Sequence, residues 1–305
     1  MPSPLTIGGF PELLDPRNRE IWDGEMELED DYIPKLFAVE TPTLETERGA
    51  SITPMELFGE FTGLVSYGGP TQGYTWNTTS KEYAKGLQIE RKLVEYDQFG
   101  VIETRVRLLA RAALQSRQVL AASALTNAFI VDPNYNNSEG VALCSDSHTS
   151  PMTGVSTSVG FDNNITDALS PASLKAMYIL GRKIRDNAGQ PSENYEFDEL
   201  WCPVDLKDRA MEIFETGTGL DTAEGNINVL KGRYKVMPWI RLTDTNNWFL
   251  CNSTLRKENL YWFDKVKPEL SSMEDFDGIV AKARGYYICH YGRADWRFIA
   301  GANVS

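Results

Sequence analysis

The sequence predicts an α+β fold organised around one long helix, and three observations support this prediction. Residues 100–129 contain no proline and no glycine after Gly100, and they are rich in Ala, Leu, Arg and Gln, which favour helices. Segments before and after this helix alternate apolar and polar residues, as half-buried strands do. The elements do not repeat as strand–helix–strand units, so the sequence does not predict a parallel α/β sheet.

The long helix, which we call the spine helix, carries one apolar stripe. Its apolar residues recur at steps of three, four and seven: Ile102, Val106, Leu109, Ala113, Leu120 and Ala124. The arginines and glutamines lie mostly off this stripe. At the usual rise per residue the helix is expected to be roughly 40–45 Å long. Ser116, Ser123 and Asn127 interrupt a heptad pattern, so we expect the helix to lie against a sheet rather than in a coiled coil.

Composition limits the classes of protein that fit the sequence. A chain of 305 residues allows one large domain or two of ordinary size, and 42% hydrophobic and 24% charged residues are typical of a folded protein. The net charge of −13 argues against a basic surface that binds nucleic acid or anionic lipid. The N-terminus lacks the features of a signal peptide, and the most apolar run, 119–131, is too short to span a bilayer. Four scattered cysteines are expected to be free thiols.

Residues 1–34 are expected to form an arm without a core of its own. Prolines at positions 2, 4, 11, 16 and 34 argue against long helices, and residues 24–34 carry a dense acidic run. The few large apolar residues are expected to pack on the body of the protein or on a neighbouring subunit; they are Leu13, Leu14, Ile21 and Trp22.

A long β-hairpin is predicted between this arm and the spine helix. Residues 35–52 have the pattern of short strands. Residues 55–76 are rich in Gly, Thr and aromatic residues around Gly68-Gly69-Pro70, and apolar alternation predicts a strand within 80–97. Two extended segments around this tip make a hairpin that is barely stable alone, so we expect it to pack on another chain.

The remainder of the chain predicts short helices, strands and loops. Ser170-Pro171 is an N-cap followed by a first-turn proline, and it begins a helix that extends to about residue 187. The other predicted elements are polar loops at 131–140 and 141–164, a strand at 199–204, a helix at 206–215, a Gly-rich acidic loop at 217–228, two strands around a turn within 230–251, and β-rich segments at 260–270 and 283–304.

The sequence contains no catalytic or cofactor-binding framework that we recognise. The chain has two histidines, His148 and His290. Ser145 and His148 are close in sequence, which leaves a hydrolase that uses these two residues as one alternative. Cys144 with His148, and Cys289 with His290, match no recurrent zinc motif. We therefore expect no enzymatic activity and no catalytic, cofactor-binding or metal-binding residues.

Several segments together resemble one protein family. They are Tyr83, Gly86, Ile89 and Leu93 before Asp97 and Gly100, the segments ALCSDSHTSP (142–151) and NVLKGRYKVMPWI (228–240), Trp248-Phe249-Leu250, and Asp295-Trp296-Arg297. In these segments and in the order of its elements, from about residue 35 to 300, the chain resembles the major capsid proteins of tailed bacteriophages with the HK-97 fold. It is nearest the Mu-like major head subunit branch. The resemblance implies a structural protein of the virion that self-assembles into the icosahedral shell around the phage genome.

The resemblance also implies a division of the chain into the parts of that fold. These are the N-arm (1–34), the start of the P-domain (35–51), the extended E-loop hairpin (52–94), the P-domain with the spine helix (95–164), the A-domain (165–232), and the returning strands of the P-domain with the C-terminus (233–305). The loop 217–228 would then lie near the axis of a capsomer. An encapsulin-like compartment shell protein of related fold is the second alternative.

The partners implied by the resemblance are other copies of the chain, in pentamers and hexamers, with portal, scaffold or protease, and decoration proteins. The shell would be assembled in the cytoplasm of the host bacterium and would enclose double-stranded DNA without sequence-specific binding and without a membrane. We expect scaffolding by a separate protein, because no scaffolding segment precedes the arm, and we predict no cross-links through Lys81 or Lys85. The residues expected at interfaces between subunits are Trp22, Gly68, Gly69, Pro70, Trp76, Gly217, Gly219 and Asp221.

Overall fold

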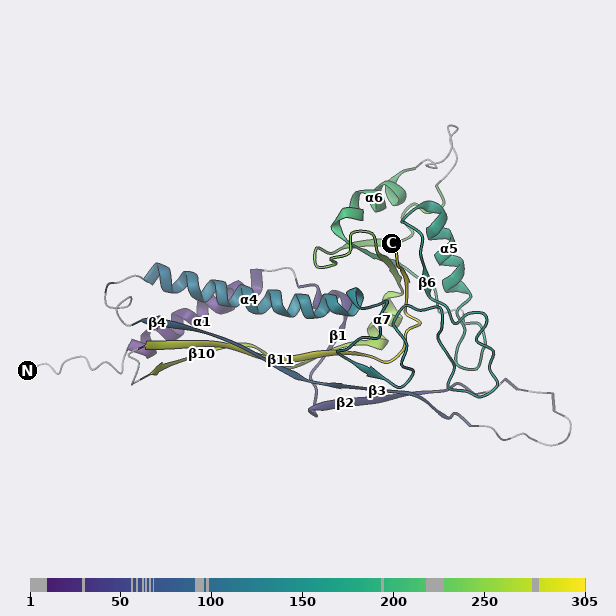
Figure 1. Cartoon of the computed structure of the whole chain (residues 1–305), viewed down its shortest axis with the longest axis horizontal. Helices are drawn as coiled ribbons and strands as arrows, with labels where there is room; N and C mark the ends of the chain where they lie inside the picture. Colours follow the sequence, from purple (N-terminus) through teal and green to yellow (C-terminus); the bar gives the residue numbers. More distant parts are fainter. Residues whose placement is uncertain are drawn as a thin grey trace, which may run out of the picture.

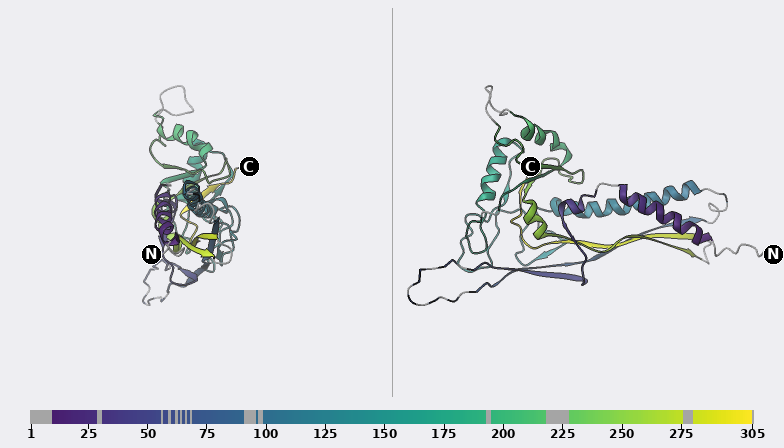
Figure 2. Two further views of the ribbon diagram at one scale, coloured as in Figure 1. Left: turned by 90° about the vertical axis from the view of Figure 1, so that its left-hand side faces the viewer. Right: turned by 180° about the vertical axis from the view of Figure 1, so that it is seen from behind.

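The computed structural model describes residues 10–28, 31–55, 57–58, 60–61, 63, 65, 67, 69–90, 96, 99–192, 195–217, 228–275 and 280–304. The molecule is elongated: helices and a sheet run lengthwise, and a second unit with its own sheet rises at the end where the C-terminus lies (Figure 1). Seen along its long axis the molecule is narrow (Figure 2, left). The predicted α+β class is confirmed.

The spine helix is α4, Phe99–Thr126, with 28 residues. At 1.5 Å per residue it is about 42 Å long. Its predicted stripe faces the protein, since Ile102, Val106 and Ala124 are all buried. The helix lies over a long sheet rather than in a coiled coil (Figure 1). The predicted spine is therefore confirmed, to within a few residues at its C-terminal end.

The sheet beneath the spine helix has four strands in the order β1-β10-β11-β4. They are β1 (Ala38–Glu40), β10 (Leu260–Asp275), β11 (Val280–Arg293) and β4 (Lys81–Glu90). β10 and β11 form a long antiparallel hairpin, β4 runs antiparallel to β11, and β1 runs parallel to β10. This sheet joins β1 and β4 to strands that lie about 200 residues later in the chain.

The N-terminal segment differs from the expected arm without long helices. It forms α1, Phe10–Leu28, a helix of 19 residues with Pro16 inside it. Pro11 lies in the first turn, where a backbone N–H has no helical partner, while Pro16 removes one helical hydrogen bond. Tertiary contacts offset this loss: α1 packs along α4 (Figure 2, right), and Trp22 is 1% exposed. The short helix α2, Ile33–Leu36, follows, with Pro34 in its first turn.

The acidic run after Trp22 binds the spine helix. Glu25 is buried and lies 2.8 Å from Arg111 and 3.7 Å from Arg107. Asp31 accepts a hydrogen bond of 2.7 Å from the side chain of Gln118 and a second, of 2.9 Å, from the N–H of Ile33. The acidic run thus helps to hold the N-terminal segment against α4.

The predicted hairpin exists with a different pairing. β2 (Thr46–Ile52) pairs antiparallel with β3 (Gln72–Thr79), and β5 (Asn136–Asn137) adds a third strand to β3. From here on, the arm means residues 46–79, and the N-terminal segment 1–34 that was expected to form an arm is called the N-arm. β4 is not part of it, because beyond Ser80 the chain no longer pairs with β2, and β4 joins the long sheet through β11. The hairpin is therefore shorter than the expected 52–94 at its C-terminal end and begins before residue 52.

A second, five-stranded sheet has the order β6-β12-β9-β7-β8. Its strands are β6 (Asn164–Ile165), β12 (Ile299–Ala302), β9 (Trp248–Cys251), β7 (Glu199–Cys202) and β8 (Lys235–Pro238). The strands predicted within 230–251 do not form a hairpin; both pair with β7, whose four residues are all buried. The sheet uses strands from both sides of residue 232, so the expected boundary there divides one sheet.

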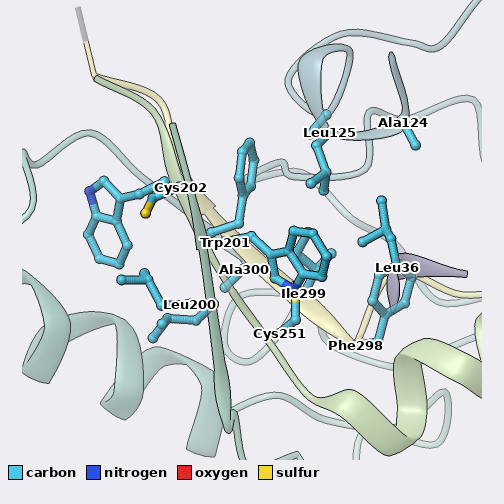
Figure 3. Close-up of a cluster of buried hydrophobic side chains, with 14 of the residues drawn as sticks. Leu36, Ala124, Leu125, Leu200, Trp201, Cys202, Cys251, Phe298, Ile299 and Ala300 are labelled. Carbon is cyan, nitrogen blue, oxygen red and sulfur yellow. The ribbon is translucent and has the colours of Figure 1, made fainter. Parts of the chain in front are cut away.

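Helices complete this five-stranded unit. They are α5 (Pro171–Arg182), the 3-10 helix η2 (Val204–Leu206), α6 (Lys207–Glu215) and α7 (Ser253–Asn259). The Ser170 hydroxyl accepts a hydrogen bond of 3.1 Å from Ser173 N–H, which confirms the predicted N-cap. The unit packs on the C-terminal end of α4: Trp201, Ile299 and Phe298 lie near Leu125 and Leu36 (Figure 3). All four cysteines are free, as predicted, and all four are buried.

Candidate assembly surfaces

Exposed large apolar side chains concentrate on the arm. Phe58 is 99% exposed and Tyr67 is 95% exposed, and the others are Ile52, Met55, Leu57, Phe61 and Val65. β2 and β3 lie along the lower edge of the body (Figure 1). A run of this density rarely faces water in a soluble monomer and marks an interaction surface. From the sequence we predicted an interface on this segment, but at Gly68, Gly69, Pro70 and Trp76. The exposed apolar side chains were not among the predicted residues.

The residues predicted at the tip lie on this surface where they are described. Gly69 and Pro70 are exposed, and no atom lies within 4 Å of the position that a Cβ on Gly69 would take. Gly68 lies outside the described residues. Trp76, at the root of the arm, is half-buried, and its ring stacks on Tyr261 and Phe263 at centroid distances of 5.9 and 6.2 Å. Trp76 therefore packs mainly on its own chain.

Trp22 is placed differently from the expected interface position. It lies in a cluster with Val106, Leu109 and Leu270, and its indole N–H donates to Pro268 O at 3.3 Å. The ring packs so closely over Gly285 that a Cβ there would lie 2.7 Å from it. A side chain that is 1% exposed within its own chain has no surface left for a neighbour in this conformation. Trp22 holds α1 on the body.

The loop predicted near a capsomer axis is described at its two ends. Gly217 is exposed, while Gly219 and Asp221 lie outside the described residues. The Asn228 side chain donates to Ile213 O at 2.5 Å and to Thr216 O at 3.0 Å, and its N–H donates to Gly217 O at 3.4 Å. Asn228 thus caps the C-terminal end of α6 and holds the two ends of the loop together.

The Ser145 and His148 segment does not form a nucleophile–base pair. The His148 ring is buried, with Nδ1 3.0 Å from Glu139 Oε1 and Nε2 3.3 Å from Leu143 O. Ser145 Oγ instead lies 2.9 Å from the Ser147 hydroxyl. Within the described ranges, no group of three or more His, Cys, Asp or Glu side chains gathers in a way that fits a metal ion. Equally, none of the described helices has the length and apolar character needed to cross a membrane.

The outer face of the long sheet carries an open groove of about 450 Å³ on β4, β10 and β11. Arg284 lies opposite Gly86 and Ser271 in the ladder, so it points away from the face where its neighbour Ala283 packs under the helices. The basic side chains that line the groove on this face are Lys282 and Arg284. The arm has three glutamates and one arginine, so the charges of arm and groove are complementary.

Two buried ion pairs hold the body, and sequence reasoning missed both. Arg117 on α4 binds Asp264 on β10, and Arg256 on α7 lies 2.8 Å from Glu199 on β7. Arg256 also donates to Leu36 O, which ties α2 to the five-stranded unit. Each pair joins residues that are far apart in the chain, so no local pattern in the sequence indicates it.

An elongated α+β body, a projecting apolar arm and a basic groove define a protein built to associate with copies of itself. Among solved structures, the chain is similar to the bacteriophage PhiM1 mature capsid (8% identity, TM-score 0.58, 91% of this chain and 88% of that chain). It is also similar to a structure from Microbacterium phage Oxtober96 (9%, 0.53, 89% and 90%) and to the virus-like particle from Pyrococcus furiosus (9%, 0.52, 94% and 98%). At such identities these likenesses show the fold, which is the HK-97 capsid fold.

The family follows from the sequence itself. The model of the phage capsid protein family matches residues 75–302, which is most of the chain. The chain belongs to the phage capsid protein family. None of the curated proteins compared with the chain matches it.

Proposed function

We propose that this protein is the major head subunit of a tailed bacteriophage and that pentamers and hexamers of it close into an icosahedral shell around the genome. The observation that carries the proposal is the run of exposed apolar side chains on the arm, headed by Phe58 and Tyr67. Burial of one large apolar side chain contributes about 1.5–3 kcal/mol, so burial of the run against a neighbour contributes on the order of 10 kcal/mol before the cost of association.

The arm acts as the E-loop, and we infer that it lies across the groove on β4, β10 and β11 of a neighbouring subunit. Two features support this docking. The groove is open, and its basic residues Lys282 and Arg284 complement Glu60 on the arm. The five-stranded unit acts as the A-domain, and its end at Gly217 and Asn228 lies toward the capsomer axis. These roles make the protein a structural one, without an enzymatic reaction.

Finer assignments rest on the sequence. Segments 142–151 and 228–240 support a place in the Mu-like major head subunit branch. A shell of this kind works with a portal, a separate scaffold or protease, and decoration proteins, and it is assembled in the host cytoplasm. The net charge of −13 supports enclosure of double-stranded DNA without sequence-specific binding, because an acidic wall repels phosphates.

Negative-stain microscopy of the purified native particle, with absorbance at 260 and 280 nm, tests the proposal. Closed shells that contain nucleic acid are expected. Shells that enclose only protein would favour a compartment protein instead of a viral capsid. A homogeneous monomer or small oligomer, across salt concentrations and with scaffold supplied, would overturn the capsid proposal.

A further inference from the structure

One segment that the assembly role leaves unexplained is the loop of residues 136–150, which we call the buttress loop. It contacts the arm at several points. Asn136 and Asn137 pair with β3, and Ser138 exchanges two hydrogen bonds of 2.9 Å with the backbone of Thr75. Farther along the arm, the hydroxyl of Tyr74 lies 2.5 Å from that of Thr149. The loop therefore contacts β3 at each residue from Tyr74 to Asn77.

A buried contact between Glu139 and His148 closes the buttress loop on itself. Glu139 and His148 have side chains that are 2% and 0% exposed, and their contact is 3.0 Å long. The same Glu139 oxygen accepts a hydrogen bond of 3.0 Å from the N–H of Thr149, the residue whose hydroxyl contacts Tyr74. Removing His148 leaves the buried Glu139 carboxylate without one of its hydrogen-bond partners, which costs more than the loss of an exposed contact.

The other side of the loop is fixed to the five-stranded unit. The His148 ring stacks on Trp296 with a centroid distance of 4.0 Å and an interplanar angle of 7°. The next residue, Arg297, donates to Asn187 Oδ1 at 2.8 Å, just beyond α5. Asn187 O in turn accepts a hydrogen bond of 2.6 Å from the Ser150 hydroxyl. The loop is thus connected to the five-stranded unit at two points. His148 contacts Trp296, and Ser150 contacts Asn187, which in turn binds Arg297.

We propose that the buttress loop fixes the direction of the arm relative to the five-stranded unit, with the Glu139–His148 pair as the brace that holds the loop rigid. The arm alone is a two-stranded hairpin with the two-residue strand β5 beside it. Such a hairpin is only marginally stable by itself, so its own hydrogen bonds do not fix its direction. The consequence for shells rests on the proposed function: an arm held at one angle sets the curvature at which neighbours meet.

Hydrogen exchange of the unassembled full-length chain, followed by mass spectrometry, tests the brace. In Tyr74→Phe, which removes only the contact with Thr149, exchange in residues 72–79 is expected to be about three- to tenfold faster. In His148→Gln, which removes the imidazole that contacts Glu139 and stacks on Trp296, it is expected to be at least about tenfold faster. Exchange in α4 is the internal reference and should not change. Ser156→Ala is the matched control, since it removes an exposed hydroxyl pair with Ser158 that lies outside the buttress loop.

Unchanged exchange in residues 72–79 in both variants would overturn the proposal. If His148→Gln also accelerates exchange in α4, the whole chain is destabilised and Tyr74→Phe alone decides. A second measurement is the diameter of assembled shells, which should vary more for Tyr74→Phe than for the wild type; equal distributions despite faster exchange would overturn the link to curvature. If the wild type forms no shells, the proposed function fails while the exchange result still decides the role of the loop.

Discussion

Arg117 and Asp264 form a bidentate ion pair between the spine helix and the long sheet, with Nη1–Oδ1 and Nη2–Oδ2 distances of 3.1 and 2.9 Å. The side chains are 8% and 6% exposed. The guanidinium also lies 5.7 Å from the ring centroid of Trp262. The ladder between β10 and β11 shifts its register directly after Asp264. The pair therefore fixes α4 to the sheet where the strand pairing is irregular.

Loss of this pair should destabilise the fold. Arg117→Ala leaves the Asp264 carboxylate buried without a partner, so the free energy of unfolding is expected to fall by about 3–5 kcal/mol. Urea denaturation of the unassembled chain measures the change. Arg209→Ala is the control, because its pair with Glu212 is exposed and should contribute less than about 1 kcal/mol. Equal losses in the two variants would contradict the importance of burial.

Substitution on the arm should separate assembly from folding. Phe58 is 99% exposed in the single chain, so Phe58→Ser is expected to leave the unfolding midpoint unchanged. Assembly should be weakened severalfold or lost, because the variant removes apolar area that a neighbour buries. Sedimentation and microscopy measure the yield of shells. Phe58→Leu keeps an apolar side chain and should retain most of that yield; full assembly of Phe58→Ser would show that Phe58 lies outside the interface.

The sequence allowed prediction of elements whose signals are local. The stripe from Ile102 to Ala124 predicted α4, and Ser170-Pro171 predicted the start of α5. The helix α1 was not predicted, because Pro16 is a strong local signal against it. What overrides that signal is burial of Trp22 under α4 and against β10, which brings together residues more than 200 positions apart.

Prediction of the hairpin and of the Ser145–His148 segment was limited in the same way, because their contacts come from distant parts of the chain. Periodicity predicted an extended hairpin before the spine helix. The partner of β4, however, is β11, nearly 200 residues later in the chain. Within segment 142–151, the sequence spacing of Ser145 and His148 left a hydrolase as one alternative. In the structure its histidine braces a loop, because Glu139 and Trp296 occupy the positions around the ring. Residue type and sequence spacing do not distinguish a structural histidine from a catalytic base. The groups that contact its ring do, and they come from other parts of the chain.

His290 should make the fold less stable in mild acid. Burial lowers its pKa below the ordinary 6.5, Lys81 lowers it further, and Asn134 O and Asp132 act in the opposite direction. Above pH 6.5 both folded and unfolded chains carry neutral His290, so it contributes no pH dependence there. Below pH 6.5 the unfolded chain binds the proton first, and the free energy of unfolding falls with pH until the folded pKa is passed. His290 is buried, and its Nε2 donates to Asn134 O.

Urea denaturation between pH 7.5 and 5.5 measures this effect as a difference. His290→Gln has no titrating ring at this position and keeps a donor for Asn134 O. The wild type is expected to lose more stability over this range than the variant, by up to about 1.4 kcal/mol per pH unit for one proton. Carboxylates titrate in both proteins and cancel in the comparison. Parallel curves for the two proteins would contradict the lowered pKa of His290.

The four cysteines should resist thiol reagents while the chain is folded. Burial raises the pKa of Cys202 and Cys289 to about 12, and it raises the pKa of Cys144 and Cys251 as well. A thiol reagent attacks the thiolate, so at pH 8 the folded chain offers little reactive or accessible sulfur. Labelling with an aromatic disulfide is expected to be slow in buffer and to reach four thiols per chain in denaturant.

An engineered cysteine calibrates this measurement. Ser158 is exposed, so Ser158→Cys should react at the rate of a free thiol and add one fast equivalent to the same chain. The slow native thiols and the fast engineered thiol are then compared under identical conditions. Rapid reaction of more than the engineered thiol would mean that the core around Cys202 and Cys251 opens on the timescale of labelling. In that event the five-stranded unit is far less stable than its burial indicates.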